Sequence, residues 1–458
     1  MRVFLDCVGC RLNQSELELI AGELRQGGAR LVKSPEESEV ILLNTCAVTS
    51  GAEADSRRAV RRAGRRNPRA QMILTGCWAT HDPAAAQRCA PGAQVVPNTE
   101  KPSVARLVLG GPASPASVRE SAVQVPIPGR RHRVRAFVKA QEGCGANCAF
   151  CLTRLLRGPA RSMPVAAVVQ QVQLAIASGA AEVVLCGVQL GAYGQDLGGG
   201  ASLEGLVRRL LSETEGARLR LSSIEPWDVS DDLLACWEDP RLCRQLHIPL
   251  QSGSRATLAR RQRPITPTEF AHVASRARAA IPGLVLTTDL LVGLPGESDA
   301  EFDESRSFVE RIAFDGAHIF TYSARPGTLA ALLPGQVDPP IARKRLCTLR
   351  ALTDQARQAA LARRVGSLDS AVWVRADQTA TAWRLTGVTS GGLQVVAPAP
   401  GNLRSNLSAV RIHGVRGSVL EADLYPACDS AVEALGVPPK TAGLCRPDEI
   451  AHGSGTPV

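Results

Sequence analysis

The stretch EGCGANCAFCLTR, residues 142–154, places three cysteines in one short loop with the spacing C-x3-C-x2-C. Cys144, Cys148 and Cys151 have no further histidine or cysteine close by, since the next cysteine downstream is Cys186. A structural zinc site normally takes four ligands, and disulfide pairing of three thiols leaves one over. Zinc and pairing are therefore the weaker alternatives. An iron–sulfur cluster is held by Cys thiolates, and three ligands would leave one iron open to a small molecule.

The loop follows a candidate strand, residues 135–140, which begins a series of six strand–helix units. Helical stretches such as 164–180 and 299–313 separate the strands. Six such units predict an incomplete (β/α)6 barrel, in which the active site lies at the C-terminal ends of the strands. The three-cysteine loop would lie at that mouth. The other strands are expected at residues 182–187, 218–223, 245–251, 284–293 and 318–323.

Residues 1–112 also alternate between strands and helices, and their βαβαβ order predicts a parallel sheet. A cysteine comes just after each strand, at Cys10, Cys46 and Cys77. Ligands of open parallel sheets bind outside the carboxyl ends of the strands, so we expect these thiols to converge in a second three-cysteine site. The alternative is three unrelated buried cysteines. The strands are expected at residues 3–6, 39–44 and 71–76.

Two helices of this first unit carry further signals. Ser15 and Glu18 stand in capping-box spacing, which predicts that the first helix begins at Ser15. The second helix, residues 52–66, carries six arginines in two adjacent rows of i,i+4 spacing. A solvated face is the usual explanation of such a run, but like charges at this spacing repel each other, which favours an RNA partner. The arginines are Arg57, Arg61 and Arg65 in one row and Arg58, Arg62 and Arg66 in the other.

The rest of the chain divides by composition. Residues 113–130 are rich in Pro, Ser and Gly and are expected to be a linker to the barrel domain, residues 131–365. A long basic helix should end that domain, from residue 339 onward. Short strands between Gly-rich turns predict a small all-β barrel at 366–425. Residues 426–458 are expected to be a loosely ordered tail.

Composition limits the function classes. The chain has 458 residues, ordinary globular composition and a net charge of +10, which is compatible with nucleic acid. Aromatic residues make up only 3%, which argues against a broad base-stacking platform. We find no secretory h-region and no apolar run long enough to span a membrane. We therefore expect a cytoplasmic protein without membrane association, whose 14 cysteines stay reduced and whose clustered cysteines serve metal or catalysis.

A C-x3-C-x2-C loop after the first strand of a partial barrel resembles the radical S-adenosylmethionine (SAM) superfamily. The resemblance implies a [4Fe–4S] cluster on Cys144, Cys148 and Cys151. It also implies that the open iron binds the amino and carboxylate groups of SAM and that one electron cleaves SAM to give a 5'-deoxyadenosyl radical.

Six further segments resemble the methylthiotransferases within that superfamily. The resemblance implies that Cys10, Cys46 and Cys77 hold a second [4Fe–4S] cluster, at which sulfur receives a methyl group from another SAM molecule. The C-terminal barrel matches the RNA-binding TRAM domain of the family in position and size, but weakly in sequence. The segments are GCRLNQSELE (9–18), LLNTCAVTSGAEADSRRAVRRA (42–63), ILTGCWA (73–79), HIPLQSGS (247–254), TTDLLVGLPGES (287–298) and YSARPGT (322–328).

Three segments, LSSIEP (221–226), LCGVQLGAYG (185–194) and NTCAVTSGAEADSRR (44–58), are most similar to one branch of this family. That branch methylthiolates C2 of N6-threonylcarbamoyladenosine at position 37 of tRNA. The resemblance implies the anticodon stem-loop of tRNA as partner, a flavodoxin or ferredoxin as electron donor, and a monomer. The alternatives are the isopentenyladenosine branch, the branch acting on an aspartate of a ribosomal protein, and, from another class, a non-catalytic iron–sulfur RNA-binding protein.

The resemblance places no catalytic side chain beyond the cluster ligands. Gly187 would let the backbone approach the methionine part of SAM, and Glu225 would accept hydrogen bonds from its ribose or amino group. Gly293 and Glu297, in the turn GLPGE, would lie beside the adenine of SAM. Glu225 could instead be a surface carboxylate, and a Gly-Pro-Gly turn is common in itself. The chain departs from the usual family pattern at three positions, which carry Cys7, Arg154 and Cys186.

Overall fold

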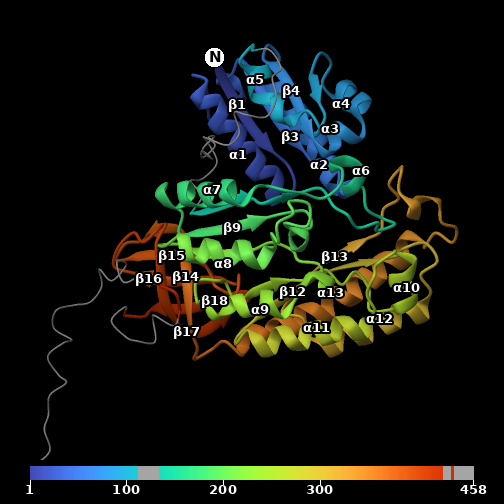
Figure 1. Cartoon of the computed structure of the whole chain (residues 1–458), viewed down its shortest axis with the longest axis vertical. Helices are drawn as coiled ribbons and strands as arrows, with labels where there is room; N and C mark the ends of the chain where they lie inside the picture. The colour runs from blue at the N-terminus through green and yellow to red at the C-terminus, as the bar shows by residue number, and fades with distance from the viewer. Residues whose placement is uncertain (112–133, 427–434, 438–458) are drawn as a thin grey trace, which may run out of the picture.

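Three folded units follow one another along the chain in a computed structural model of the protein (Figure 1). The structure describes residues 1–111, 134–426 and 435–437. The linker expected at 113–130 and nearly all of the tail expected at 426–458 lie outside the described residues. Within the described part of the chain, no helix is long and apolar enough to cross a membrane.

The N-terminal unit is a parallel sheet of five strands in the order β2-β1-β3-β4-β5, which confirms the expected parallel sheet. Helix α1 packs Leu17 and Ile20 against one face, whereas α2 and α3 pack Val60 and Trp78 against the other. Because both faces are covered, every residue of β3 is buried. The strands are β1 (Arg2–Cys7), β2 (Arg30–Val32), β3 (Val40–Thr45), β4 (Gln71–Gly76) and β5 (Gln94–Val96). The helices are α1 (Arg11–Gln26), α2 (Ser50–Arg66), α3 (Cys77–His81), α4 (Pro83–Cys89) and α5 (Val104–Val108).

The predicted start of α1 is wrong, because the residue that caps the helix is Cys10 and not Ser15. Ser15 is buried within the helix. In the first turn, the Asn13 side chain donates through Nδ2 to the carbonyls of Val8 (2.9 Å) and Thr45 (3.0 Å). These contacts with the carboxyl edge of the sheet hold the first turn in helical conformation, and such tertiary contacts outweigh local sequence preferences.

The central unit contains the six expected parallel strands, which confirms the partial barrel. The strands form two three-stranded sheets, β10-β9-β6 and β11-β12-β13, joined by an isolated bridge between Leu219 and Leu242. The strands are β6 (Arg135–Lys139), β9 (Glu182–Cys186), β10 (Arg218–Leu221), β11 (Gln245–His247), β12 (Val285–Val292) and β13 (Gly316–Thr321), with a short pair β7 (Gln141–Glu142) and β8 (Arg161–Ser162). The helices are α6 (Thr153–Arg157), α7 (Val165–Ala177), α8 (Leu203–Glu213), α9 (Asp231–Ala235), α10 (Arg255–Arg260), α11 (Pro267–Ala280), α12 (Asp299–Ile312) and α13 (Pro339–Ala362).

One apolar core lies between these strands and the helices that cover them. Leu246, Leu286 and Leu290 point into it and meet Phe270 and Phe308 from the helices. Side chains alternate along a strand, so Thr287 and Asp289 occupy the opposite face of β12, away from the helices. That face of the half-barrel is where polar side chains collect.

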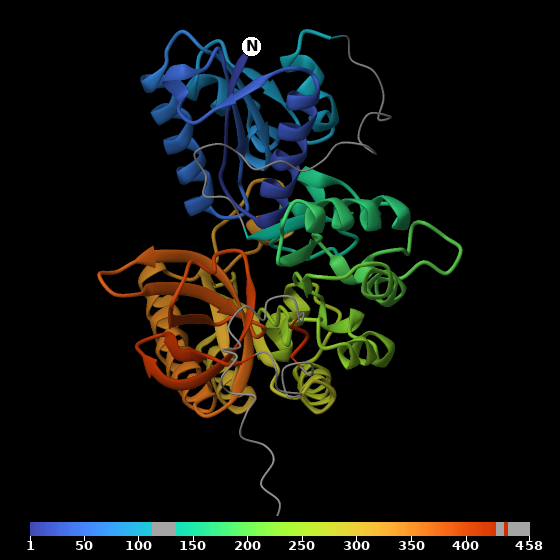
Figure 2. The ribbon, with the colours of Figure 1, turned by 90° about the vertical axis from the view of Figure 1, so that its left-hand side faces the viewer.

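The third unit is a closed barrel of five strands in the order β14-β15-β16-β18-β17, which confirms the expected all-β unit. It lies against one flank of the central unit, and the N-terminal unit is stacked on top of the central unit (Figure 2). Buried Arg218 and Arg220 of β10 both pair with Glu182 of β9 and donate to the barrel carbonyls of Val388 (2.7 Å) and Thr389 (3.0 Å). The barrel strands are β14 (Leu368–Gln378), β15 (Trp383–Thr389), β16 (Gln394–Ala399), β17 (Leu407–Arg416) and β18 (Val419–Leu424).

Candidate functional site

The fold brings the N-terminal cysteines together at one edge of the first sheet. Cys10 caps α1 after β1, Cys46 comes directly after β3, and Cys77 opens α3 after β4. Strands β1, β3 and β4 are neighbours, so the three thiols leave the sheet side by side. Burial is the main cause that raises the pKa of Cys46 to about 12, and the nearby thiols of Cys77 and Cys10 also raise it. The predicted convergence of these cysteines is thus present in the structure.

Glycines give this edge the room that the cysteines need. Gly9 has φ +106°, and a Cβ there would lie 2.5 Å from Cys46 Cβ and 2.7 Å from Cys46 Sγ. Gly76 has φ +97°, and a Cβ there would overlap the backbone of Thr45. Only glycine combines this backbone conformation with so close an approach. The close packing at this edge of the sheet therefore requires glycine at position 9, before Cys10, and at position 76, before Cys77.

The second triad lies in the loop between β7 and α6. Backbone N–H groups are directed at two of its sulfurs, from Ala146 to Cys144 (3.4 Å) and from Thr153 to Cys151 (3.4 Å). Nη1 of Arg263 lies 3.7 Å from the Cys148 sulfur. Burial raises the pKa of Cys144 to about 11, so this thiol stays protonated at neutral pH unless a cation replaces the proton.

The donor atoms of both triads are cysteine sulfurs, which are the usual ligands of an iron–sulfur cluster. The described cysteines are free thiols, and each triad offers three soft ligands that would ionise on binding iron. The N–H and guanidinium groups around the second triad would stabilise the negative charge that bound thiolates carry. Helix α1, with sixteen residues, directs its N-terminus at Cys10 and favours negative charge there.

Glu225 lies next to the second triad but makes its contact through an arginine. Its Oε2 accepts from Nη2 of Arg263 (2.7 Å), the same side chain that reaches Cys148 and the carbonyl of Pro249. The guanidinium also stacks over the ring of Trp227 at 4.8 Å. Glu225 is therefore not a free surface carboxylate. Its contact with SAM stays a prediction.

The other three residues expected at SAM have tight contacts within the protein. A Cβ on Gly187 would lie 3.0 Å from Gln141 Oε1, and one on Gly293 would lie 2.7 Å from Ala342 Cβ. Glu297 is buried and forms an ion pair with Arg345 at 2.9 Å. These contacts account for Gly187, Gly293 and Glu297 as parts of the strand-end loops. Their contact with SAM also stays a prediction.

A buried charge network that the sequence did not reveal connects the two triads. Arg157, six residues after Cys151, donates through Nη2 to Asn13 Oδ1 (2.6 Å) and through Nη1 to Glu16 Oε1 (2.9 Å). Lys101 Nζ donates to the other oxygen of Glu16 (2.6 Å). Burial opposes the charge of Glu16, but Lys101 and Arg157 hold its pKa well below the usual range. The only trace of this network in the sequence is that Asn13 and Glu16 stand three residues apart, shortly after Cys10.

A second link between the units runs through Asn98. Its Nδ2 donates to the carbonyl of Leu156 at 3.0 Å and lies 3.8 Å from the sulfur of Cys77. One amide thus touches a ligand of the first triad and the helix that follows the second. The two cysteine sites are held in a fixed relation by hydrogen bonds and charge.

The arginine rows of α2 are partly neutralised. Glu53 pairs with Arg57 and also with Arg325 of the central unit (2.7 Å). Among the residues that the structure describes, Arg61 and Arg65 are exposed and make no ion pair. The repulsion expected along this face is therefore relieved at four positions, and an RNA contact of the helix stays a prediction. The other pairs are Arg58 with Asp55, Arg62 with Asp6 and Arg66 with Glu36.

Two family profiles match this chain. Residues 2–97 match the "Uncharacterized protein family UPF0004", and residues 138–309 match the "Radical SAM superfamily". The chain is 34% identical to "Threonylcarbamoyladenosine tRNA methylthiotransferase MtaB" of Bacillus subtilis, over 76% of this chain and 79% of that protein. It is also 34% identical to "tRNA-2-methylthio-N(6)-dimethylallyladenosine synthase" of Acidothermus cellulolyticus, over 76% of this chain and 72% of that protein. "Ribosomal protein uS12 methylthiotransferase RimO" of Anaeromyxobacter sp. is 34% identical over 82% of this chain and 83% of that protein.

A solved structure has a similar fold over much of the chain. The radical S-adenosylmethionine methyltransferase TsrM from Kitasatospora setae, with cobalamin and a [4Fe–4S] cluster bound, matches with a TM-score of 0.53. It is 13% identical, and the match covers 72% of this chain and 77% of that chain. This likeness shows that the fold is shared.

Proposed function

Because this chain belongs to the radical SAM methylthiotransferases, we propose that it methylthiolates C2 of N6-threonylcarbamoyladenosine at position 37 of tRNA. As a member of the family it is an enzyme that uses SAM and [4Fe–4S] clusters. This excludes the alternative of a non-catalytic binding protein. The observation that carries the proposal is the presence of two separate three-thiol sites, joined across one interface by Arg157 and Asn98.

The substrate is inferred from three short segments, because overall identity does not select the branch. Proteins named for threonylcarbamoyladenosine are 34% identical to this chain in Bacillus subtilis, Thermotoga maritima and Aquifex aeolicus, and relatives named for the other two branches are 34% identical as well. The segments 44–58, 185–194 and 221–226 agree with the threonylcarbamoyladenosine branch. The anticodon stem-loop of tRNA would then be the partner, in the cytoplasm, with a monomeric enzyme and a flavodoxin or ferredoxin as electron donor.

We assign the six triad cysteines as the cluster ligands. When bound, the clusters and SAM supply the radical that removes the C2 hydrogen and the sulfur that replaces it. The chain's own residues have positioning and electrostatic roles. Arg263 holds Glu225 beside Cys148, while the N–H groups of Ala146 and Thr153 stabilise thiolate charge. Cys46 and Cys77 of the first site are buried, whereas Cys10 is exposed.

Nearby groups would complete the substrate sites. Gly187, Glu225, Gly293 and Glu297 are assigned to SAM by family resemblance, and Glu225 is the one whose side chain is only partly buried beside the cysteine loop. The RNA surface is assigned to the α2 arginines. Arg61 and Arg65 are its best candidates because no carboxylate neutralises them among the described residues.

The test is a substrate comparison with reconstituted enzyme, SAM and a reductant. Three acceptors are offered, which are tRNA with N6-threonylcarbamoyladenosine, tRNA with isopentenyladenosine, and ribosomal protein uS12. Mass spectrometry of nucleosides and peptides should find the methylthio group only on the first. Methylthiolation of either other acceptor, with the first unmodified, would assign the chain to another branch. Formation of 5'-deoxyadenosine is followed in parallel to show that the enzyme is active.

A further inference from the structure

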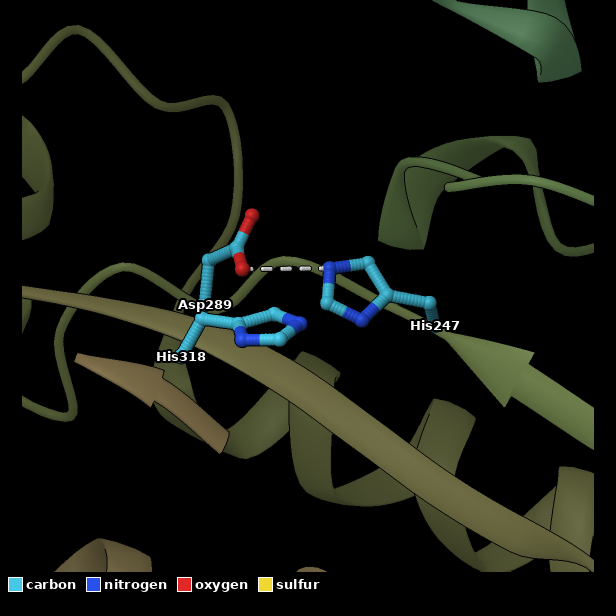
Figure 3. A group of neighbouring side chains, drawn as sticks. All are labelled: His247, Asp289 and His318. Atoms are coloured by element: carbon cyan, nitrogen blue, oxygen red, sulfur yellow. Dashed lines mark ion pairs between the residues drawn. The ribbon is translucent and has the colours of Figure 1, made fainter. Parts of the chain in front are cut away.

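A compact group of metal-binding side chains lies apart from both cysteine triads. His247 ends β11, Asp289 lies on β12, and His318 lies on β13, on the strand face turned away from the helices (Figure 3). Asp289 and His318 are register partners on adjacent strands. One ligand atom from each of the three residues lies within 4.8 Å of the others.

The spacing of the first two ligands is compatible with a shared metal ion as well as with a direct ion pair. His247 Nε2 and Asp289 Oδ1 are 3.2 Å apart. A charge-assisted N–H···O⁻ bond is usually about 2.7–2.9 Å. Two ligands at about 2.0–2.2 Å from a tetrahedral zinc lie about 3.4 Å from each other. His318 is exposed, so rotation of its side chain can bring its ring nitrogen to the same point.

The second nitrogen of His247 is fixed by a threonine. Nδ1 lies 2.9 Å from Oγ1 of Thr287, whose own proton is directed at the carbonyl of Leu246 (3.4 Å). In the neutral tautomer that donates a hydrogen bond from Nδ1 to Oγ1, Nε2 is unprotonated and its lone pair faces the carboxylate of Asp289. A proton on Nε2 or a metal ion between the two groups would relieve the repulsion between this lone pair and the carboxylate. Metal-binding histidines are oriented in this way by a hydrogen bond from their other nitrogen.

We propose that His247, Asp289 and His318 bind one divalent metal ion of the zinc class. Two imidazoles and a carboxylate are ligands that zinc uses in proteins, and a three-ligand site leaves a position for water or a substrate oxygen. The site is close to the radical SAM loop. The carbonyl of His247 accepts from the N–H of Ile224, which precedes Glu225. The metal would therefore lie on the substrate-facing side of the half-barrel.

The test measures zinc on the full-length holoenzyme. Protein with both clusters reconstituted is freed of loose metal with a chelator, titrated with zinc, and analysed by mass spectrometry for zinc and iron per chain. Competition with a chromophoric chelator gives the affinity. We expect one zinc per chain in addition to the cluster irons. His318→Ala should weaken zinc binding at least tenfold, and Thr287→Val should weaken it by about 10–100-fold, as loss of outer-shell support does.

A matched control is His413→Ala on the C-terminal barrel. His413 also pairs with an aspartate, Asp423 (3.0 Å), but this pair is exposed and belongs to no three-ligand group among the described residues. Its substitution should leave zinc binding unchanged. Absence of zinc on the holoenzyme, or binding that His318→Ala does not weaken, would make His247 and Asp289 an ordinary ion pair. Iron content must stay equal between variants, so that zinc in empty cysteine sites is not counted. The outcome is independent of which RNA or protein the enzyme modifies.

Discussion

The two cysteine triads reach the same ligand number by opposite routes. Cys10, Cys46 and Cys77 are 36 and 31 residues apart and meet only because three neighbouring strands end at one edge. The other three lie within one loop, residues 144–151, whose sequence spacing already sets them close together. The first site is therefore a property of the tertiary fold and the second a property of a local segment. Substitutions that disturb the N-terminal fold should therefore remove the first site, whereas substitutions within the loop should remove the second.

The largest effect should come from removing either triad. Reconstituted wild-type enzyme should hold about eight irons, and either triple Cys→Ala variant about four. Replacing Cys10, Cys46 and Cys77 should abolish methylthio transfer but leave cleavage of SAM to 5'-deoxyadenosine. Replacing Cys144, Cys148 and Cys151 should abolish both reactions. Loss of SAM cleavage in a folded first-triad variant that keeps four irons would contradict this division of roles.

A single glycine should separate the fold-dependent site from the local one. Gly9→Ala places a Cβ against Cys46 at φ +106°, so we expect loss of the first cluster and about half of the iron. Gly28→Ala is the matched control, because Gly28 has φ +82° with nothing within 4 Å of the added Cβ. It should cost about 1–2 kcal/mol of stability and keep all the iron. Equal iron in the two variants would show that the edge tolerates a side chain.

The Arg157 network should matter to both triads, since it joins them. Arg157→Met removes the hydrogen bonds from Arg157 to buried Glu16, which keeps its ion pair with Lys101, so the loss should be about 1.5–3 kcal/mol. Urea unfolding followed by circular dichroism would measure the loss. Arg209→Met is the control, because Arg209 and Glu213 form an exposed pair, worth at most about 1 kcal/mol. If the two variants lose the same stability, Arg157 does not fasten the units together.

The smallest effect concerns RNA. Arg61→Gln with Arg65→Gln removes the two unpaired charges of α2 and keeps helix propensity nearly constant. If both contact phosphates, the slope of log affinity for tRNA against log salt should flatten by about 1.5 units. Adding Arg57→Gln should change the slope little, because Glu53 neutralises Arg57. SAM cleavage should persist in all these variants. An unchanged slope would make α2 an ordinary solvated face.

The sequence predicts well those strands whose run of apolar residues is long enough to recognise. All nine central strands of the two parallel units were expected, whereas β2 and β5, with three residues each, are too short to show a pattern. The capping signal at Ser15 failed because tertiary contacts of Asn13 decide where α1 begins. The link from Arg157 to Glu16 spans 141 residues, and no local pattern reports such a pair.

The candidate site shows the same limit. The six cysteines stand out by spacing and topology, so their convergence could be inferred. His247, Asp289 and His318 lie inside the expected strands 245–251, 284–293 and 318–323, but no motif marked them as ligands. Their proximity to one another depends on the register of β11, β12 and β13, which a single sequence does not specify.

Glu182 and its arginines have a mechanical consequence. Because Arg218 and Arg220 are tied at once to Glu182 and to carbonyls of the C-terminal barrel, the barrel has no hinge at this contact. A nucleic acid bound to the barrel would be held at a fixed distance from the cysteine loop. If the barrel binds RNA, this fixed distance would select which nucleotide of the folded RNA reaches the cysteine loop.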